Sequence, residues 1–125
     1  MNIDELDEWI KKEKIKVDSP DVYGKIVLSK GVLKAKRIYL ERIQTDSPKD
    51  TGWFIGFAEK EKNKGNYEAI WVGDLIKLRS KLLSILQLPA GYMVIVDGDK
   101  IDYIDYLDNG KNISVYKNSD VERKL

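Results

Sequence analysis

The stretch TGWFIGFA, residues 51–58, decides the fold because its large apolar side chains alternate with the period of a β-strand. Trp53, Ile55 and Phe57 share one face, which predicts a strand packed on a core. The other face carries Phe54, Gly56 and Ala58. Small residues such as Gly56 suit the close approach of a helix or another strand. The stretch therefore predicts a buried strand at this point of the chain.

The corner before this strand, Asp50-Thr51-Gly52, allows two interpretations. As a reactive site, Thr51 would need a general base, but an aspartate with an ordinary pKa of about 4 is a poor base for a hydroxyl. As a turn, the corner needs only a hydrogen bond from Asp50 or Thr51 to the turn backbone and an unusual φ at Gly52. Trp53 would then enter the core as a large apolar anchor. The structural interpretation is favoured, because no Lys or His accompanies the motif.

Further strands and two helices are expected on either side of this corner. Residues 3–13 have apolar side chains at helical spacing and acidic residues first, as the helix dipole favours. A linker follows, in which Pro20 and Gly24 break regular secondary structure. Period-two patterns predict strands at residues 25–29, 36–43, 68–72, 92–96 and 100–107, and residues 112–118 could add a last strand. Asp97-Gly98 is a strong hairpin-turn signal.

A helix is predicted at about residues 74–87, with Asp74 as its N-cap. Its buried stripe would be formed by Leu75, Leu78, Leu82 and Ile85 or Leu86. Pro89 prevents its continuation.

These elements predict an α+β fold, with an antiparallel sheet of five or six strands, the helix at about 74–87 packed on one face, and an N-terminal helix. One domain is expected over residues 1–125. It comprises an N-terminal helix and linker (1–22), a central part (25–96), a C-terminal hairpin (97–118) and a frayed tail (119–125).

Composition excludes several classes of site. The 125 residues contain 22 basic and 21 acidic side chains, and neither cysteine nor histidine. Disulfides, thiolate metal sites and nucleophiles paired with histidine are thereby excluded, and no metal or other cofactor is predicted. The acidic start lacks the apolar region of a secretion signal, and no run approaches the about 18 apolar residues of a membrane helix. A cytoplasmic protein is expected.

The segment YLERIQTDSPKDTGWFIGFAE, residues 39–59, resembles the signature of a bacterial immunity-protein family of polymorphic toxin systems, formerly a domain of unknown function. The matching residues are Ser29-Lys30, Tyr39, Glu41-Arg42, Asp50-Thr51-Gly52-Trp53, Gly56, Glu59 and the turn Leu88-Pro89-Ala90-Gly91. Thr51 replaces the usual Ser, and Glu41-Arg42 inverts the usual order. The resemblance covers about residues 25–96. It implies a protein that neutralises a co-encoded toxin by binding it, without catalysis.

Charge is uneven along the chain. Basic residues gather on the first two predicted strands, at Lys25, Lys30, Lys34, Lys36, Arg37 and Arg42, whereas Asp97, Asp99, Asp102, Asp105 and Asp108 make the later hairpin acidic. The hairpin does not have the spacing of a calcium loop, and its period of three fits neither a strand face nor a helix stripe. It could be a solvated edge that discourages edge-to-edge pairing. It could equally be an acidic surface for a basic partner, with tyrosines as anchors.

The sequence thus predicts a non-enzymatic immunity protein that binds a cognate toxin, which is expected to be basic. The expected partner-binding residues are Asp99, Asp102, Tyr103, Asp105 and Tyr106. The alternative is a housekeeping interaction or nucleic-acid-associated adaptor that uses the basic strands over residues 25–42. The lysines of these strands are not interleaved with exposed aromatic side chains on which bases could stack. They are better explained as ordinary solvated residues on strand faces. No membrane association is expected.

Overall fold

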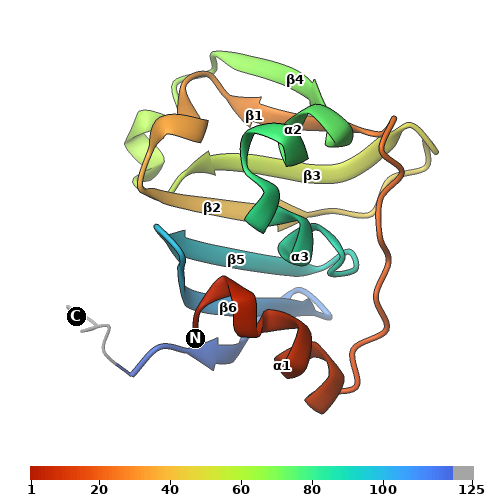
Figure 1. Cartoon of the computed structure of the whole chain (residues 1–125), viewed down its shortest axis with the longest axis vertical. Helices are drawn as coiled ribbons and strands as arrows, with labels where there is room; N and C mark the ends of the chain where they lie inside the picture. Colours follow the sequence, from red (N-terminus) through yellow and green to blue (C-terminus); the bar gives the residue numbers. More distant parts are fainter. Residues whose placement is uncertain (120–125) are drawn as a thin grey trace.

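A computed structural model of the chain describes residues 1–119, so the predicted frayed tail, residues 119–125, lies outside the described residues except for Ser119. Seven strands form one sheet in the order β4-β1-β3-β2-β5-β6-β7 (Figure 1). Their bounds are β1 Lys25–Ser29, β2 Arg37–Arg42, β3 Asp50–Phe57, β4 Tyr67–Trp71, β5 Tyr92–Asp97, β6 Lys100–Asp108 and β7 Lys111–Lys117. All neighbouring strands are antiparallel except β1 and β3, which are parallel.

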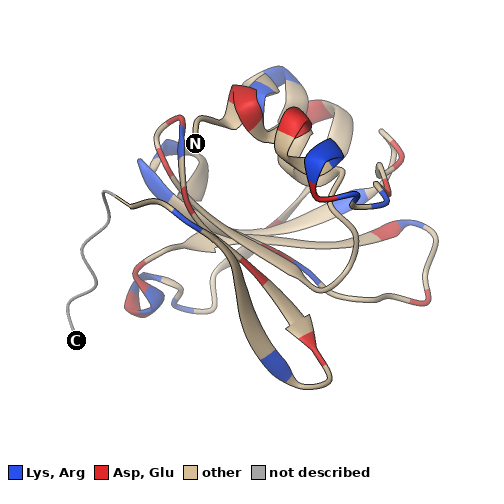
Figure 2. Ribbon diagram, turned by 90° about the horizontal axis from the view of Figure 1, so that it is seen from below, with Lys and Arg blue, Asp and Glu red and all other residues tan. Residues whose placement is uncertain are grey.

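The α-helices lie on one face of this sheet, and none of those in residues 1–119 covers the opposite face (Figure 2). They are α1 (Leu6–Lys12) with the 3-10 turn η1 (Ile3–Glu5), and α2 (Val72–Leu78), η4 (Ser80–Leu82) and α3 (Leu83–Leu86). Two further 3-10 turns, η2 (Val32–Lys34) and η3 (Lys60–Lys62), lie in connections. The predicted α+β class and N-terminal helix are confirmed. The sheet has seven strands instead of five or six, and its parallel pair arises because β3 inserts between β1 and β2.

The helix expected over residues 74–87 is interrupted. It begins at Val72 after Trp71, so Asp74 is not its N-cap. Arg79 leaves helical geometry at φ −143° and ψ 77°, and the chain then continues as η4 and α3. The break turns the second half toward the sheet, where Leu82 is fully buried, while Leu78 is 65 % exposed. Leu78 was therefore wrongly assigned to the buried stripe.

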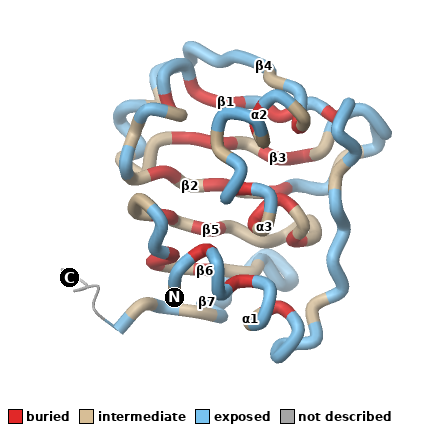
Figure 3. The backbone as a smooth tube through the Cα atoms, viewed as in Figure 1, coloured by how far each residue is buried: buried red, intermediate tan, exposed pale blue. Residues whose placement is uncertain are grey.

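The core lies between the helices and the sheet, where buried residues follow the central strands (Figure 3). Trp53 is the largest fully buried side chain, at 1 % exposure. Its indole Nε1 donates a 3.0 Å hydrogen bond to the carbonyl of Leu86 in α3. Trp53 therefore joins the middle of the sheet to the helical layer through both apolar contact and a satisfied polar group.

A β-bulge in β6 explains the period of three that the sequence shows there. Val96 pairs with Ile101 and Ile95 pairs with Tyr103, so Asp102 is an extra residue with no partner in β5. The bulge resets the alternation, and Ile101 and Ile104 both face the core although they are three residues apart.

We expect Trp53→Ala to lower the free energy of unfolding by about 3–5 kcal/mol, because it leaves a cavity and removes the indole hydrogen bond to the carbonyl of Leu86. Trp71→Ala is the matched control, since Trp71 is 45 % exposed, and it should cost much less. Urea unfolding of both variants measures the difference. Equal losses in the two variants would contradict the central position of Trp53.

Candidate functional site

The corner Asp50-Thr51-Gly52 is held by hydrogen bonds to backbone. The amide of Gly52 donates to Oδ1 of Asp50 at 2.9 Å. The hydroxyl of Thr51 donates to the carbonyl of Lys25 at 2.8 Å and accepts from the amide of Trp53 at 3.1 Å. Gly52 has φ +80°, and a Cβ there would lie 2.0 Å from the carbonyl oxygen of Ile43. Both polar side chains of the corner therefore serve the turn, which supports its structural interpretation.

Arg42 lies in surroundings that the sequence did not predict. Its side chain is only 8 % exposed and points to the helical side of the sheet. Nε donates to the carbonyl of Thr51 at 2.9 Å, and Nη1 donates to the carbonyls of Asp18 at 2.5 Å and Leu88 at 2.9 Å. Its guanidinium also lies 5.7 Å from the centre of the Trp53 ring. Burial lowers the pKa of Arg42, and Asp18 opposes this shift.

A polar pocket of about 300 Å³ opens beside this corner, with Asp18, Asp21, Asp50 and Arg42 among its lining residues. Oδ1 of Asp21 accepts from the amide of Tyr23, as Asp50 does from Gly52, so both carboxylates serve turns. Within residues 1–119, no group of three or more acidic, His or Cys side chains is arranged to hold a metal ion. The pocket is explained by the packing of the linker against the corner.

The five predicted partner-binding residues do not share one surface. Asp99 lies in the β5–β6 turn, where Lys81 Nζ is 3.0 Å from its Oδ2. Asp102 is buried, with its Oδ2 3.5 Å from Arg37 Nε. Tyr106 packs against Tyr92, with ring centres 4.7 Å apart, beside a groove lined partly by the N-terminal linker. Tyr103 and Asp105 lie together on the face without helices, as the pairing of β5 with β6 requires.

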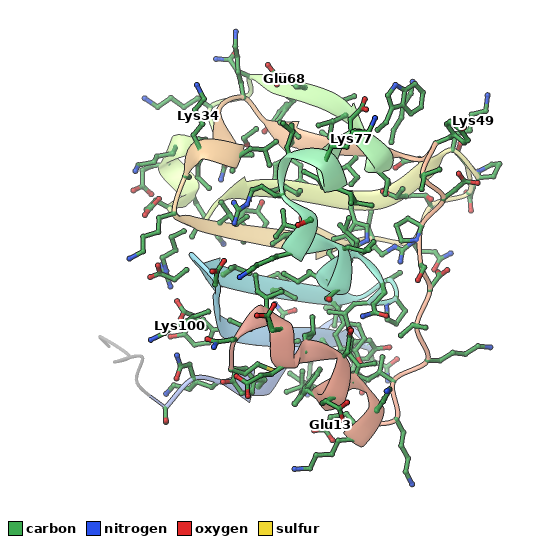
Figure 4. All side chains as sticks on the ribbon, viewed as in Figure 1. Glu13, Lys34, Lys49, Glu68, Lys77 and Lys100 are labelled. Carbon is green, nitrogen blue, oxygen red and sulfur yellow. The ribbon has the colours of Figure 1, made fainter. Side chains whose placement is uncertain are left out.

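The basic residues of the first two strands are also dispersed. Arg42 is buried, Arg37 pairs with Asp102, and Lys36 Nζ lies 3.4 Å from Asp97 Oδ1. Lys34 extends from the periphery of the molecule (Figure 4). Because these cations do not line one groove or ridge, the geometry does not favour the nucleic-acid adaptor that the sequence left open.

The face without helices carries a surface that sequence reasoning missed, here called the open strip. It consists of two adjacent rows of side chains that cross β4, β1, β3, β2, β5 and β6. One row runs through Ala69, Val27, Phe54, Glu41, Met93 and Asp105. The other contains Tyr67, Ser29, Gly56, Tyr39, Ile95 and Tyr103. Most of these side chains are apolar or aromatic, although no helix covers them.

Three aromatic rings of the open strip pack on one another. Tyr39 and Tyr67 each lie with ring centres 5.7 Å from that of Phe54. A Cβ at Gly56 would lie 2.7 Å from both the Tyr39 and the Phe54 rings. Gly56 is therefore approached closely by two aromatic rings and, at 3.0 Å, by Oδ1 of Asn63 at the end of η3. Burial, followed by the charge of Glu41, raises the pKa of the Tyr39 hydroxyl.

Comparison with known proteins identifies the family. The Imm33-like domain model matches residues 6–108. The chain belongs to the Imm33-like family. No curated protein and no solved structure matches it. This Imm33-like chain is therefore an immunity protein of polymorphic toxin systems, as the resemblance implied. The matched range extends beyond residues 25–96 and includes α1 and β6.

Imm33-like immunity domains are typically non-catalytic, and the family implies a cognate toxin as partner. In residues 1–119 no helix has both the length and the apolar character needed to span a bilayer.

We expect Asp102→Asn to lower the free energy of unfolding by about 1–3 kcal/mol, because it removes the charge that pairs with Arg37 at a buried position. Asp108→Asn is the control on the same strand; Asp108 is exposed, and its change should stay within about 0.5 kcal/mol. Thermal or urea unfolding distinguishes the two. A neutral Asp102→Asn would show that the carboxylate is free to serve a partner instead.

Proposed function

We propose that this Imm33-like chain neutralises its cognate toxin by direct, stoichiometric binding, without catalysis, in the cytoplasm of the bacterium that makes the toxin. The toxin is the one encoded beside the gene for this chain. Membership of the Imm33-like family over residues 6–108 is the observation that carries the proposal.

The arrangement of polar groups supports a binding role. A reactive Thr51 would need a base and a free hydroxyl, but its hydroxyl is already bonded to Lys25 and Trp53. The chain has no histidine or cysteine to act as base or nucleophile. The open strip, in contrast, offers the aromatic surface that protein interfaces favour.

The acidic hairpin remains part of the proposal in a narrower form. Tyr103 and Asp105 share the open strip and are proposed to contact the toxin, with Asp105 accelerating association with a basic partner. Asp99 is proposed to add to this long-range attraction from the β5–β6 turn. Asp102 and Tyr106 would contribute indirectly, because they hold Arg37 and Tyr92 in place.

Titration of the purified toxin with this chain tests the mechanism. If neutralisation is stoichiometric, half a molar equivalent should leave half of the toxin activity, and this fraction should not change with longer incubation. One equivalent should abolish the activity, and a complex of the two proteins should elute together in gel filtration.

A continuing loss of toxin activity at substoichiometric amounts would instead reveal a catalytic antidote. Full toxin activity at excess immunity protein would contradict neutralisation by this chain altogether.

A further inference from the structure

We propose that the open strip is the surface that docks the toxin, and that the docked segment of the toxin presents Arg or Lys side chains beside apolar ones. The proposal deepens the function proposed above and rests on it. It assigns the interface to the face without helices, centred on β2 and β3.

The first argument is the amount of apolar surface left on this face. Tyr67 is 56 % exposed and Val27 40 %, and both lie at the β4–β1 end of the open strip. Phe54 and Tyr39 are half-buried beside them. A contiguous group of partly exposed aromatic and apolar side chains marks an interaction site, whereas single exposed apolar residues are normal on any protein surface.

The second argument is that the strip is pre-organised. Gly56 provides the space in which the Tyr39 and Phe54 rings lie against the strand. The Tyr67 ring packs on the other side against Phe54. Rings that are already ordered lose little conformational entropy when a partner covers them. Tyrosine and tryptophan are also the residues that most often dominate binding energy.

Glu41 determines the charge of the partner. It is half-buried in the open strip, between Phe54 and Met93 in the register, and among residues 1–119 it has no ion-pair partner. Asp105 lies on the far side of Met93 in the same row. Carboxylates set among aromatic rings favour an incoming Arg or Lys, whose charge reaches the carboxylate while its stem or guanidinium packs on a ring.

The same position of Glu41 disfavours a second copy of this chain as the occupant. Glu41 lies on β2, near the middle of the open strip. A twofold axis through the centre of this face would bring the two Glu41 carboxylates near each other in a desolvated interface. A basic segment of a different protein would be attracted to this position.

The test compares Tyr67→Ala and Glu41→Gln in binding kinetics with the purified toxin domain encoded beside this gene, at two ionic strengths. Tyr67→Ala should speed dissociation at least about tenfold, because it removes an anchoring ring. Glu41→Gln should weaken binding by about tenfold and reduce its dependence on salt. Both variants should keep the wild-type melting temperature, since neither side chain is in the core.

Leu78→Ala and Glu8→Gln are the matched controls, because both residues are exposed on the helical layer. They should bind as the wild type does. If instead Tyr67→Ala and Glu41→Gln bind normally while the wild type still neutralises the toxin, the docking face is wrong and the proposed function stands.

Failure of the wild type to bind the toxin would overturn both proposals. Sedimentation of the chain alone tests whether a second copy of the chain occupies the open strip instead. A dimer that Tyr67→Ala dissociates would assign the open strip to self-association, contrary to the proposal.

Discussion

The guanidinium of Arg42 is the interaction on which the arrangement of this molecule depends. It reaches the carbonyls of Thr51, Asp18 and Leu88 and lies over the ring of Trp53, while the carbonyl of Arg42 accepts from the amide of Gly91. One buried cation thus holds the corner at the start of β3, the N-terminal linker and the turn after α3 against β2. Within the described residues, no buried side-chain nitrogen or oxygen lacks a hydrogen-bond partner, so its charge is placed without leaving unsatisfied groups.

The contacts of Arg42 and Trp53 with the helices occupy only one face of the sheet, which leaves the other face to serve a different role. Arg42, Trp53 and the helices all lie on the same side, and the next residues along the strands, Glu41 and Phe54, necessarily point to the other. The residues that give the chain its resemblance to immunity proteins therefore divide between two tasks. One set holds the fold, and the alternate set forms the open strip, the surface proposed to meet the toxin.

The sequence predicted the α+β class, the strand at residues 51–58 and the hairpin at Asp97-Gly98, because alternation and turn residues are local signals. It could not place Arg42, since a strand arginine is usually solvated and its burial here depends on carbonyls of segments about 24 and 46 residues away. The bulge at Asp102 depends on pairing with β5, and the break at Arg79 on packing against the sheet. The open strip was missed because it becomes contiguous only when six strands are in register, although alternation already separated Phe54 and Gly56 from Trp53 and Ile55.

Hydroxyl-radical footprinting of the chain, alone and bound to its toxin, would test most directly whether the face without helices is the docking surface. Side-chain oxidation of Tyr67 and Phe54 should fall on binding, whereas that of Leu78 and Leu83, which are exposed on the helical layer, should not change. Protection of Leu78 and Leu83 with unchanged oxidation of Tyr67 and Phe54 would place the toxin on the opposite side of the molecule and contradict this account.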